Sequence, residues 1–557
     1  MDNGKRINRR ILFFACVLVL MLSLLILRLF YIQIIEGKGY AKRAASQRML
    51  DLPLDVSRGQ IYDRNMIPLT GRTVVNSLVV FPAIVDDKDT AARLISEITN
   101  LSDRDAVLLL EGDSRPIKLS IADGKEDRTI PEEVKGLMIV KDVVRYDDDS
   151  VARHLIGYVD GTDRIGRAGL EKLYHYYLAG QRDVSIAAMV DGSKRLIPGL
   201  GYKARVNSED IEYYNLALTI DYHIQRVVEE VMDKKRINGA VVVLDVGSGE
   251  VLAMASRPDY RQDSVGDYLD GKNGELLNKA IQQYNLGSIF KIVVTAALLE
   301  RNLVNPFEKV YCPGYTYVGD IQVKCSSFED GGHGELNIYE AFARSCNTFY
   351  IEMGKRVGGE AIIRLAQEFG YGSITGINPF EEQPGLLPDI NQVYKADIGN
   401  LSIGQGKILV TPIQVADMTN TIANNGIRKV PTVVKGLVSE NGKLIQAAEK
   451  TKPEQIISPF VAMEIRKMME MVVEEGTGKA AAIEGWEGSA GKTSSAQTGQ
   501  RIGESEIVHA WFTGYVPKVR PKYVITVMAE NGKSGGSVAA PVFRDIAQGI
   551  LDLGDRH

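Results

Sequence analysis

The sequence predicts three structural parts: a single-pass membrane anchor, a mixed α/β domain, and an α+β domain whose antiparallel sheet is flanked by helices. Three observations lead to this prediction. An apolar run follows basic residues at the N-terminus, short β-rich and helical stretches alternate up to about residue 210, and strand patterns stand at both ends of the remaining chain. We therefore expect a cytoplasmic tail over 1–10, an anchor over 11–35, an N-terminal domain over 36–210 and a C-terminal domain over 211–557.

The predicted anchor is an apolar run from Ile11 to Leu27 behind four basic residues, continued past Arg28 to Ile35. At about 1.5 Å per residue the uninterrupted run covers roughly 26 Å, and the extension completes the ~30 Å hydrocarbon core if Arg28 reaches the interface. The basic flank predicts a cytoplasmic N-terminus with the rest of the chain outside the cell membrane. A cleaved signal peptide is the alternative, but no small-x-small cleavage site follows the run.

The region from 36 to 210 carries short strand and helix patterns. Residues Ser77–Val85 and Gly136–Val144 are β-rich, and Asp89–Ile98 is helical. Gly166–Gly180 predicts one helix with Leu170, Leu173, Tyr174 and Tyr177 on a core face. The formal net charge of -5 gives no basic excess, so we expect no nucleic-acid partner.

The C-terminal domain begins with a strand, a helix and a buried hairpin, and it ends with a strand and a helix. Because strands stand at both ends, we expect one sheet closed by the two termini of the domain. The predicted elements are Asn215–Ile220, Asp221–Lys235, Gly239–Asp245, Val251–Ser256, Val524–Met528 and Pro541–Leu553.

The first chemical motif is Ser288-Ile289-Phe290-Lys291 at the start of an apolar helical run. Residues three apart share a helix face, so the Ser288 hydroxyl and the Lys291 ammonium are able to meet. Burial lowers the pKa of a lysine, which would let Lys291 act as a base for a serine nucleophile. A capping serine beside a lysine that reaches solvent explains the same pattern when the motif stands alone.

Two further motifs follow in order. Ser345-Cys346-Asn347 ends a helical run over Ile338–Arg344 and offers a hydroxyl and an amide to a cleft; a helix C-cap is the alternative. Lys492-Thr493 follows a glycine, but Trp486 stands where a phosphate loop requires its first glycine. We therefore expect an edge strand of the active-site sheet at Lys492-Thr493, with groups suited to a substrate carboxylate.

Together the S-x-x-K, S-x-N and K-T-x motifs resemble the penicillin-binding protein and serine β-lactamase superfamily. The resemblance is to the class B penicillin-binding proteins and extends over nearly the whole chain. The matching segments are Arg58–Asn65, Ala152–Val159, Gly169–Leu178, Asn215–Gln225, Ala240–Pro258, Ile403–Gly406, Thr411–Gln414 and His509–Pro517. It implies a peptidoglycan D,D-transpeptidase that β-lactams acylate, with an N-terminal pedestal domain.

The resemblance also implies a role for each motif residue. Ser288 would attack the penultimate D-Ala carbonyl of a stem peptide, and Lys291 would take its proton. Ser345 and Lys492 would pass a proton to the departing D-Ala, while Asn347 would orient the substrate amide. Thr493 and Ser495 would hold the terminal carboxylate, and the N–H groups of Ser288 and Ser495 would form the oxyanion hole. No metal or organic cofactor is required.

Two positions depart from the family pattern. Ser494 stands where the family usually has glycine, which lets a substrate strand approach the backbone closely. A serine there would narrow the groove, change β-lactam preference or be absorbed by a small shift. Leu286 replaces the proline often found before Gly287, with no obvious chemical consequence.

The cysteines raise a separate question. Cys312, Cys325 and His333 fall close together in sequence with Asp330 nearby, which fits a structural zinc site. A Cys312–Cys325 disulfide and two free thiols are the alternatives. Cys346 is expected to be a small buried residue, because the middle position of S-x-N should point away from the cleft.

Other functions remain as alternatives to a transpeptidase. A β-lactamase or D,D-carboxypeptidase would use the same nucleophile, although no clear deacylating carboxylate motif is visible. A non-catalytic scaffold or β-lactam sensor would retain the fold only. For the transpeptidase, the resemblance suggests a multi-spanning SEDS-type glycosyltransferase as partner in elongation, division or sporulation.

Overall fold

The computed structural model describes residues 3–40, 43, 49–56, 58–112, 115–131, 133–160, 164–179, 183–191, 197, 202–207, 214–390, 393, 395–485, 487–503 and 505–554. The chain divides into two compact units, each described by itself. The first contains residues 1–57, 74–143 and 181–211, and the second contains 58–73, 144–180 and 212–557. The second unit therefore includes two segments that lie in the N-terminal third of the sequence.

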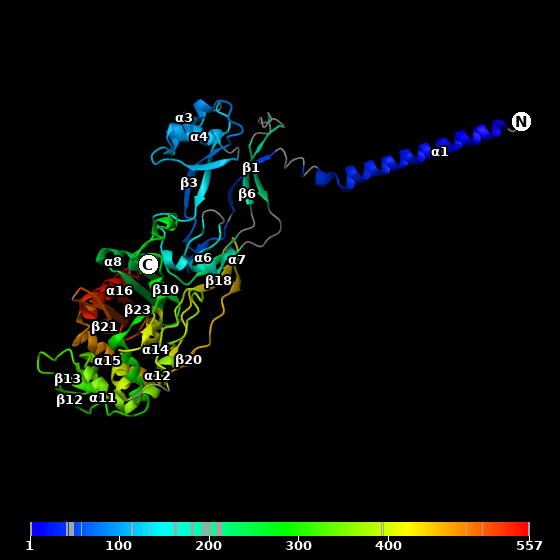
Figure 1. Ribbon diagram of the computed structural model, residues 1–557. Helices are drawn as coiled ribbons and strands as arrows, with labels where there is room; N and C mark the ends of the chain where they lie inside the picture. The colour runs from blue at the N-terminus through cyan, green and yellow to red at the C-terminus, as the bar shows by residue number, and fades with distance from the viewer. Residues whose placement is uncertain are drawn as a thin grey trace. The chain divides into compact units, whose positions relative to one another are not determined.

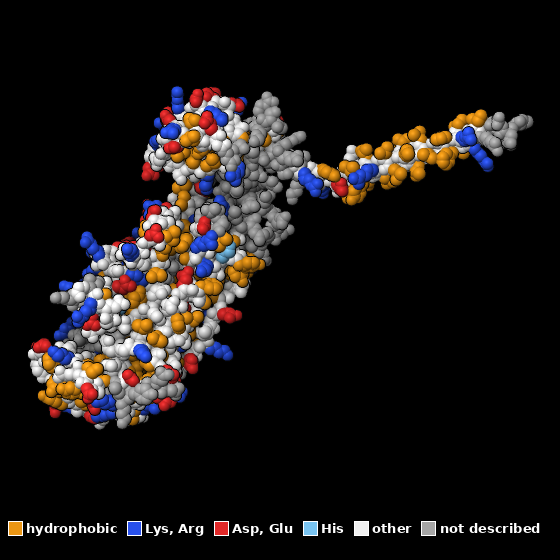
Figure 2. Space-filling model, viewed as in Figure 1, with side chains coloured by type: hydrophobic (Ala, Val, Ile, Leu, Met, Phe, Trp, Pro, Cys, Tyr) orange, Lys and Arg blue, Asp and Glu red, His pale blue; other side chains and the backbone are white. Residues whose placement is uncertain are grey.

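The N-terminal helix α1 (Asn3–Phe30) continues into a π-helical turn, η1 (Tyr31–Ile35). Its apolar side chains are exposed along its length, as Figure 2 shows. Within the described residues, one helix is long and apolar enough to cross a membrane. It spans Ile7–Ile35, and an 18-residue window of it has a mean hydropathy of 2.8 and no buried part. The pattern is that of a single membrane anchor, because exposed leucines and phenylalanines at this density are otherwise costly in water.

The described residues in the rest of the first unit form two three-stranded sheets and two helices. One sheet has the order β1-β6-β7 and the other the order β4-β3-β5. Helices α3 and α4 bury Ala92, Ile95 and Leu110 in a core with Leu78 and Val80 of β3. The bounds are β1 Met49–Val56, β3 Thr73–Val80, α3 Lys88–Ile98, α4 Asp103–Glu111, β4 Ile117–Ser120, β5 Leu137–Val144, β6 Asp183–Met189 and β7 Tyr202–Asn207.

The second unit is built on a five-stranded antiparallel sheet with the order β10-β9-β23-β22-β21 (Figure 1). Strand β9, near the start of the domain, pairs with strand β23, near its end, at the centre of this sheet. The sheet is therefore closed by the two ends of the domain, as expected. The bounds are β9 Gly239–Asp245, β10 Val251–Arg257, β21 Ala490–Ile502, β22 Ser505–Val516 and β23 Tyr523–Ala529.

Alternation along these strands gives the sheet two buried faces. Val241 and Phe512 point to the core formed with α8 and α16, whereas Val242 and Trp511 point to the larger core formed with α9, α10, α11, α14 and α15. A strand buried on both faces reads as a continuous apolar run, which is why GAVVVLD was recognisable as a strand. The helices are α8 Tyr222–Lys235, α9 Lys291–Glu300, α10 Ile338–Ala343, α11 Asn347–Val357, α14 Pro412–Ala423, α15 Pro459–Glu474 and α16 Ala540–Gly554.

Shorter elements complete the second unit. A four-stranded sheet has the order β19-β18-β8-β2, and the remaining strands form two-stranded pairs. The helical elements are α5 Arg153–Ile156, α6 Gly169–Leu173, α7 His175–Leu178, η2 Val265–Tyr268, η3 Lys279–Ile281, η4 Gly287–Phe290, α12 Gly359–Glu368, α13 Lys395–Ser402, η6 Lys479–Ala481 and η7 Gly535–Ala539. The strands are β2 Ile61–Tyr62, β8 Asn215–Leu218, β11 Tyr284–Asn285, β12 Val310–Cys312, β13 Tyr315–Val318, β14 Ile321–Lys324, β15 Gly334–Leu336, β16 Leu409–Val410, β17 Ile427–Arg428, β18 Val434–Val438, β19 Leu444–Ala447 and β20 Glu454–Gln455.

The predicted fold class is confirmed, and one predicted element is wrong. The single helix expected over Gly166–Gly180 is two short helices, α6 and α7, with Tyr177 38% exposed. The physical reason is Glu171, which is fully buried and accepts hydrogen bonds from Arg58 and Arg145. A buried ion pair with distant segments, rather than a continuous apolar face, fixes the path of this stretch.

Candidate active site

The serine of the first motif lies in a tight turn before a buried helix. Ser288 belongs to the 3₁₀ turn η4, and Lys291 is the first residue of α9. Gly287 has a φ of 63°, and a Cβ there would lie 2.5 Å from the Ser494 hydroxyl. Glycine is therefore required both by the left-handed conformation and by the close approach of β21. The Ser288 hydroxyl is half-buried and makes no hydrogen bond within the described residues.

Lys291 links the first motif to the second. Its ammonium is fully buried and donates to the Ser345 carbonyl at 2.7 Å, the Ser345 hydroxyl at 3.2 Å and Asn347 Oδ1 at 2.8 Å. Burial removes the hydration of the ammonium and lowers the pKa of Lys291 to about 8. A lysine with such a pKa is partly neutral near physiological pH and is suited to accept a proton.

The third motif also contacts Ser345. Lys492 on β21 is also fully buried and donates to the Ser345 hydroxyl at 3.1 Å. Burial, and then the positive charge of Lys291, lowers the pKa of Lys492 well below its ordinary value. Ser345 itself has a φ of 56° between α10 and α11, an uncommon conformation for a non-glycine residue. Its strained backbone places one hydroxyl between two lysines.

Alternation along β21 separates the residues of the third motif. Lys492 and Ser494 share the face that meets α9, whereas Thr493 and Ser495 share the other face. The Thr493 hydroxyl is bonded to the Thr477 hydroxyl, and the exposed Ser495 hydroxyl accepts a hydrogen bond from the Gly535 N–H at 3.1 Å. Since β21 is the edge of the five-stranded sheet, its outer backbone groups are open to a further strand.

The structure thus brings four of the predicted site residues into one hydrogen-bonded group: Lys291, Ser345, Asn347 and Lys492. Ser288 lies one helical turn before Lys291 without a bond to it. Thr493 and Ser495 lie on the adjacent edge strand. The group contains the Ser345 hydroxyl, two lysines of lowered pKa and the Asn347 amide. Such groups beside a serine nucleophile are suited to acyl transfer.

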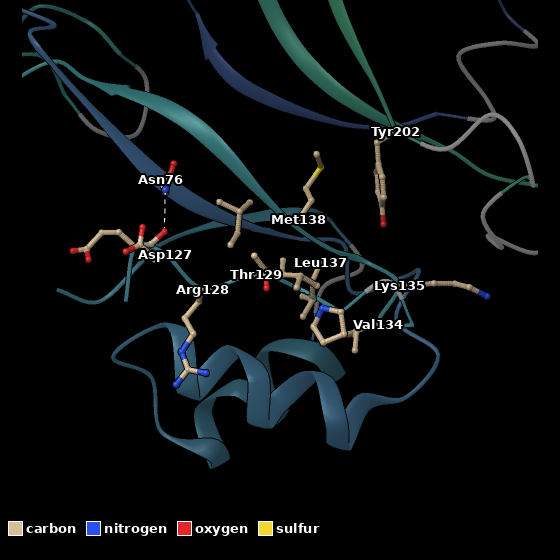
Figure 3. A pocket seen from close by; sticks show the side chains of 13 residues that line it. Asn76, Asp127, Arg128, Thr129, Val134, Lys135, Leu137, Met138 and Tyr202 are labelled. Atoms are coloured by element: carbon tan, nitrogen blue, oxygen red, sulfur yellow. Dashed lines mark hydrogen bonds between the residues drawn. The ribbon is translucent and has the colours of Figure 1, made fainter. Parts of the chain in front are cut away.

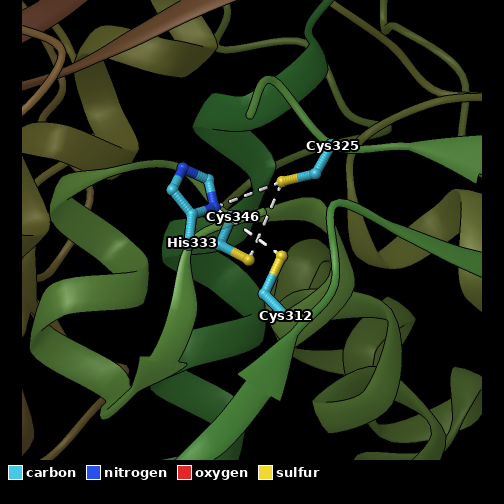
Figure 4. A group of neighbouring side chains, drawn as sticks. All are labelled: Cys312, Cys325, His333 and Cys346. Carbon is cyan, nitrogen blue, oxygen red and sulfur yellow. Dashed lines mark hydrogen bonds between the residues drawn. The ribbon is translucent and has the colours of Figure 1, made fainter. Parts of the chain in front are cut away.

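A second cluster lies directly beside the S-x-N motif. Figure 4 shows the side chains of Cys312, Cys325, His333 and Cys346 pointing toward one another, and their ligand atoms all lie within 4.8 Å. His333 Nδ1 is 3.7 Å from Cys312 Sγ and 3.5 Å from Cys325 Sγ, and Cys325 Sγ is 3.8 Å from Cys346 Sγ. All four cysteines of the chain are free thiols, so the alternative of a Cys312–Cys325 disulfide is absent from the described residues.

The geometry of this thiol cluster fits a tetrahedral metal ion. With zinc–sulfur bonds of about 2.3 Å, tetrahedral ligand atoms lie about 3.8 Å apart, close to the separations between these side chains. Asp330 is not among the four clustered residues. Cys346, expected only to be small and buried, is the fourth member. Its place in the middle of the S-x-N motif could have indicated this, because a side chain that points away from the cleft must enter the core behind the motif.

The thiol cluster is also bonded to the motif. The Asn347 N–H donates to Cys325 Sγ at 3.3 Å, and the Asn347 side-chain amide donates to the Lys324 carbonyl at 3.1 Å. The segment at Lys324 and Cys325 therefore accepts hydrogen bonds from both the backbone N–H and the side-chain amide of Asn347, whose Oδ1 accepts from Lys291.

A separate cavity of about 810 Å³ lies in the first unit (Figure 3). Its polar side chains are engaged locally: the Asn76 amide donates to the Glu126 carbonyl, and the Tyr202 hydroxyl accepts from the Gly136 N–H. The cavity belongs to the packing of β3, β5 and the segment from 126 to 135 and shows none of the features of the active-site group.

Comparisons with known proteins agree with this geometry. The family described as penicillin binding protein transpeptidase domain matches residues 239–548, and the penicillin-binding protein dimerisation domain matches residues 53–213. The chain is 28% identical over 572 residues to stage V sporulation protein D of Bacillus subtilis, covering 98% of this chain and 86% of that protein. It is 28% identical over 597 residues to peptidoglycan D,D-transpeptidase MrdA of Acinetobacter baumannii, covering 97% and 88%.

A solved structure is similar over nearly the whole chain. It is titled "Structural coordination of polymerization and crosslinking by a peptidoglycan synthase complex", with a TM-score of 0.70 and 26% identity over 97% of this chain and 98% of that one. The chain therefore belongs to the class B penicillin-binding proteins, and its larger unit contains a serine-type transpeptidase domain. The predicted family is confirmed, and enzymes of this family need no organic cofactor.

Proposed function

We propose that this protein cross-links peptidoglycan as a D,D-transpeptidase and that Ser288 is the residue acylated by stem peptides and by β-lactams. The observation that carries the proposal is the convergence of two fully buried lysines on the Ser345 hydroxyl. One of them, Lys291, lies one turn after Ser288. Burying two ammonium groups without a carboxylate partner is costly, and such an arrangement is retained where the lowered pKa is used.

Acylation begins at the nucleophile turn. Neutral Lys291 accepts the proton of the Ser288 hydroxyl as the serine oxygen bonds to the carbonyl carbon of the penultimate D-Ala. The N–H groups of Ser288 and Ser495 donate to the oxygen that becomes negative in the tetrahedral intermediate. Asn347, whose Oδ1 accepts from Lys291, fixes that lysine and orients the substrate amide.

The leaving group then departs as D-Ala. Its nitrogen takes a proton from the Ser345 hydroxyl, which is replenished through Lys492, and the carbon–nitrogen bond breaks. Thr493 and Ser495 hold the terminal carboxylate at the edge strand during this step. An amine of a second stem then attacks the acyl-enzyme carbonyl and gives its proton to the Ser345–Lys492 pair. The ester bond to Ser288 breaks, Lys291 returns its proton to the Ser288 oxygen, and the new amide bond is the cross-link.

The cell-membrane setting is part of the proposal. We place residues 1–10 in the cytoplasm, 11–35 in the membrane, and the pedestal (36–210) and transpeptidase domain (211–557) outside. The apolar helix at Ile7–Ile35 supports the single span. Likeness to a structure of a peptidoglycan synthase complex supports a SEDS-type glycosyltransferase as partner.

The acylation claim is tested by intact-mass measurement after incubation with benzylpenicillin. The wild-type chain should gain the mass of one drug molecule, and the Ser288→Ala variant should gain none. A wild-type chain that never gains the mass, or a variant that gains it equally, would contradict the assignment. Fast loss of the adduct would instead favour a hydrolytic enzyme.

We further propose that Cys312, Cys325, His333 and Cys346 hold a structural zinc ion. The four ligand atoms lie within 4.8 Å of one another and the three cysteines are buried, which supports the proposal. When bound, zinc would fix the end of β12, which carries Cys312, and the segment that carries Cys325 against the start of α11.

Metal analysis of the full chain in detergent tests the zinc proposal. The wild-type protein should carry about one zinc per chain. Cys325→Ser should lose it, whereas Cys16→Ser, which changes an exposed thiol of α1, should keep it. A metal-free wild-type protein, or full zinc content in Cys325→Ser, would refute the site.

A further inference from the structure

Ser494 occupies the third position of the K-T-x motif and is bonded to the turn that carries the nucleophile. Its side chain is 2% exposed, and its hydroxyl donates to the Leu286 carbonyl at 2.7 Å. Leu286 lies two residues before Ser288. The side chain of Ser494 is therefore directed toward the turn that carries the nucleophile.

A second donor acts on the neighbouring carbonyl. Trp511 is the cross-strand partner of Ser494 in the β21–β22 pair, and its indole N–H donates to the Asn285 carbonyl at 3.0 Å. Two adjacent side chains of the sheet thus hold two successive carbonyls of the chain segment that leads into Ser288. Leu286 is fully buried, so its carbonyl would lose its partner if the Ser494 hydroxyl were removed.

The turn is confined on its other side as well. The Gly287 N–H donates to the Gly404 carbonyl at 3.1 Å, and a Cβ at Gly404 would lie 2.0 Å from the Gly287 carbonyl oxygen. A Cβ at Gly287 would meet the Ser494 hydroxyl at 2.5 Å. The turn at Gly287 is therefore closely packed between Gly404 and Ser494. The hydroxyl of Ser494 fixes the position of this turn against β21.

We infer that Ser494 is a positioning residue that sets the distance between the Ser288 turn and the edge strand β21. This inference rests on the proposed function. Ser494 precedes Ser495, whose N–H is one proposed oxyanion donor, and its hydroxyl holds the backbone just before Ser288, whose N–H is the other. The hydrogen bond from Ser494 to Leu286 therefore links the two halves of the oxyanion hole. The distance between these two N–H donors affects the rate of acylation more than the binding of the substrate.

The test is a time course of acylation by a fluorescent penicillin at several concentrations, which separates the maximal acylation rate constant from the dissociation constant of the initial complex. Ser494→Ala and Ser494→Gly are compared with the wild type in the full-length protein. Ser489→Ala is the matched control, because Ser489 is 3% exposed and its hydroxyl donates to the Ala481 carbonyl at the same 2.7 Å. Thermal unfolding of each variant reports its folding.

Ser494→Ala and Ser494→Gly should lower the maximal acylation rate constant about five- to tenfold and change the dissociation constant less than about twofold. Ser489→Ala should lower the unfolding midpoint comparably and leave the rate constant unchanged. Equal rate constants for Ser494→Ala and Ser489→Ala, or an effect confined to the dissociation constant, would overturn the inference. A wild type and a control that both stay unlabelled would show instead that the proposed function fails.

Discussion

Two groups of buried charges in the larger unit follow opposite designs. Glu171 is fully buried and accepts from Arg58 Nε at 2.6 Å and from Arg145 Nε at 2.6 Å. Lys291 and Lys492 are equally buried, yet among the described residues neither contacts a carboxylate. Their partners are neutral oxygens of the S-x-N motif and of the β21 backbone.

The difference separates a structural role from a chemical one. The carboxylate of Glu171 lies between two arginines and joins segments that lie far apart in sequence. Ammonium groups with neutral partners hold their charge poorly, which lowers the pKa of Lys291 to about 8. The first arrangement stabilises the fold, whereas the second makes protons available for transfer.

The largest effect is expected at Lys291, which contacts no carboxylate among the described residues. Lys291→Met keeps the volume and removes the base, so acylation by penicillin should slow by about 10²- to 10⁴-fold while stability is unchanged or higher. Lys279→Met is the matched control, because Lys279 is 3% exposed but paired with Glu530 at 2.6 Å. The control should lose stability and keep acylation. Near-normal acylation in Lys291→Met would remove the base from the proposed mechanism.

The paired group should respond in the opposite way. Glu171→Gln leaves two arginines facing a neutral amide, and we expect a loss of about 3–5 kcal/mol in the free energy of unfolding. The acylation rate of the folded protein should not change. Glu360→Gln, which breaks an exposed pair with Arg364, should cost about 0.5 kcal/mol or less. Denaturant unfolding of both variants measures the contrast, and equal losses would mean that the burial of Glu171 carries no weight.

A smaller effect is expected from pH. Below the Lys291 pKa of about 8 the acylation rate should rise about tenfold per pH unit and then level off, because only the neutral amine accepts a proton. Since this pKa lies below the ordinary 10.5, the unfolded chain binds more protons between the two values. The stability contributed by this group is therefore complete above 10.5 and is lost as the pH falls through 8. A flat acylation profile between pH 6 and 9 would contradict the assignment.

Much of the fold was predictable because its patterns are local. The apolar run GAVVVLD and the turn after it predicted β9 and β10, and their bounds agree with the structure within a residue. The ordered motifs at Ser288, Ser345 and Lys492 predicted a common site, and the last two meet through one hydrogen bond. The periodicity of apolar residues and the order of the motifs can both be recognised in the sequence without knowledge of tertiary contacts.

The parts that were missed depend on long-range contacts. The path over 166–180 follows from Glu171 meeting arginines more than twenty residues away, which no local period records. Cys346 joins Cys325 only because β14 ends beside the start of α11. The orientation of Ser494 toward Leu286 likewise depends on the register of β21 against the nucleophile turn.

The most direct test of the account is D-Ala release from a stem-peptide donor in the presence of an amine acceptor, measured together with the cross-linked product. The wild-type protein should release one D-Ala for each new amide bond, and Ser288→Ala should release none. Equal release by Ser288→Ala would contradict the role of Ser288. Release that yields only the hydrolysed donor would show that the two unpaired lysines serve a carboxypeptidase rather than a transpeptidase.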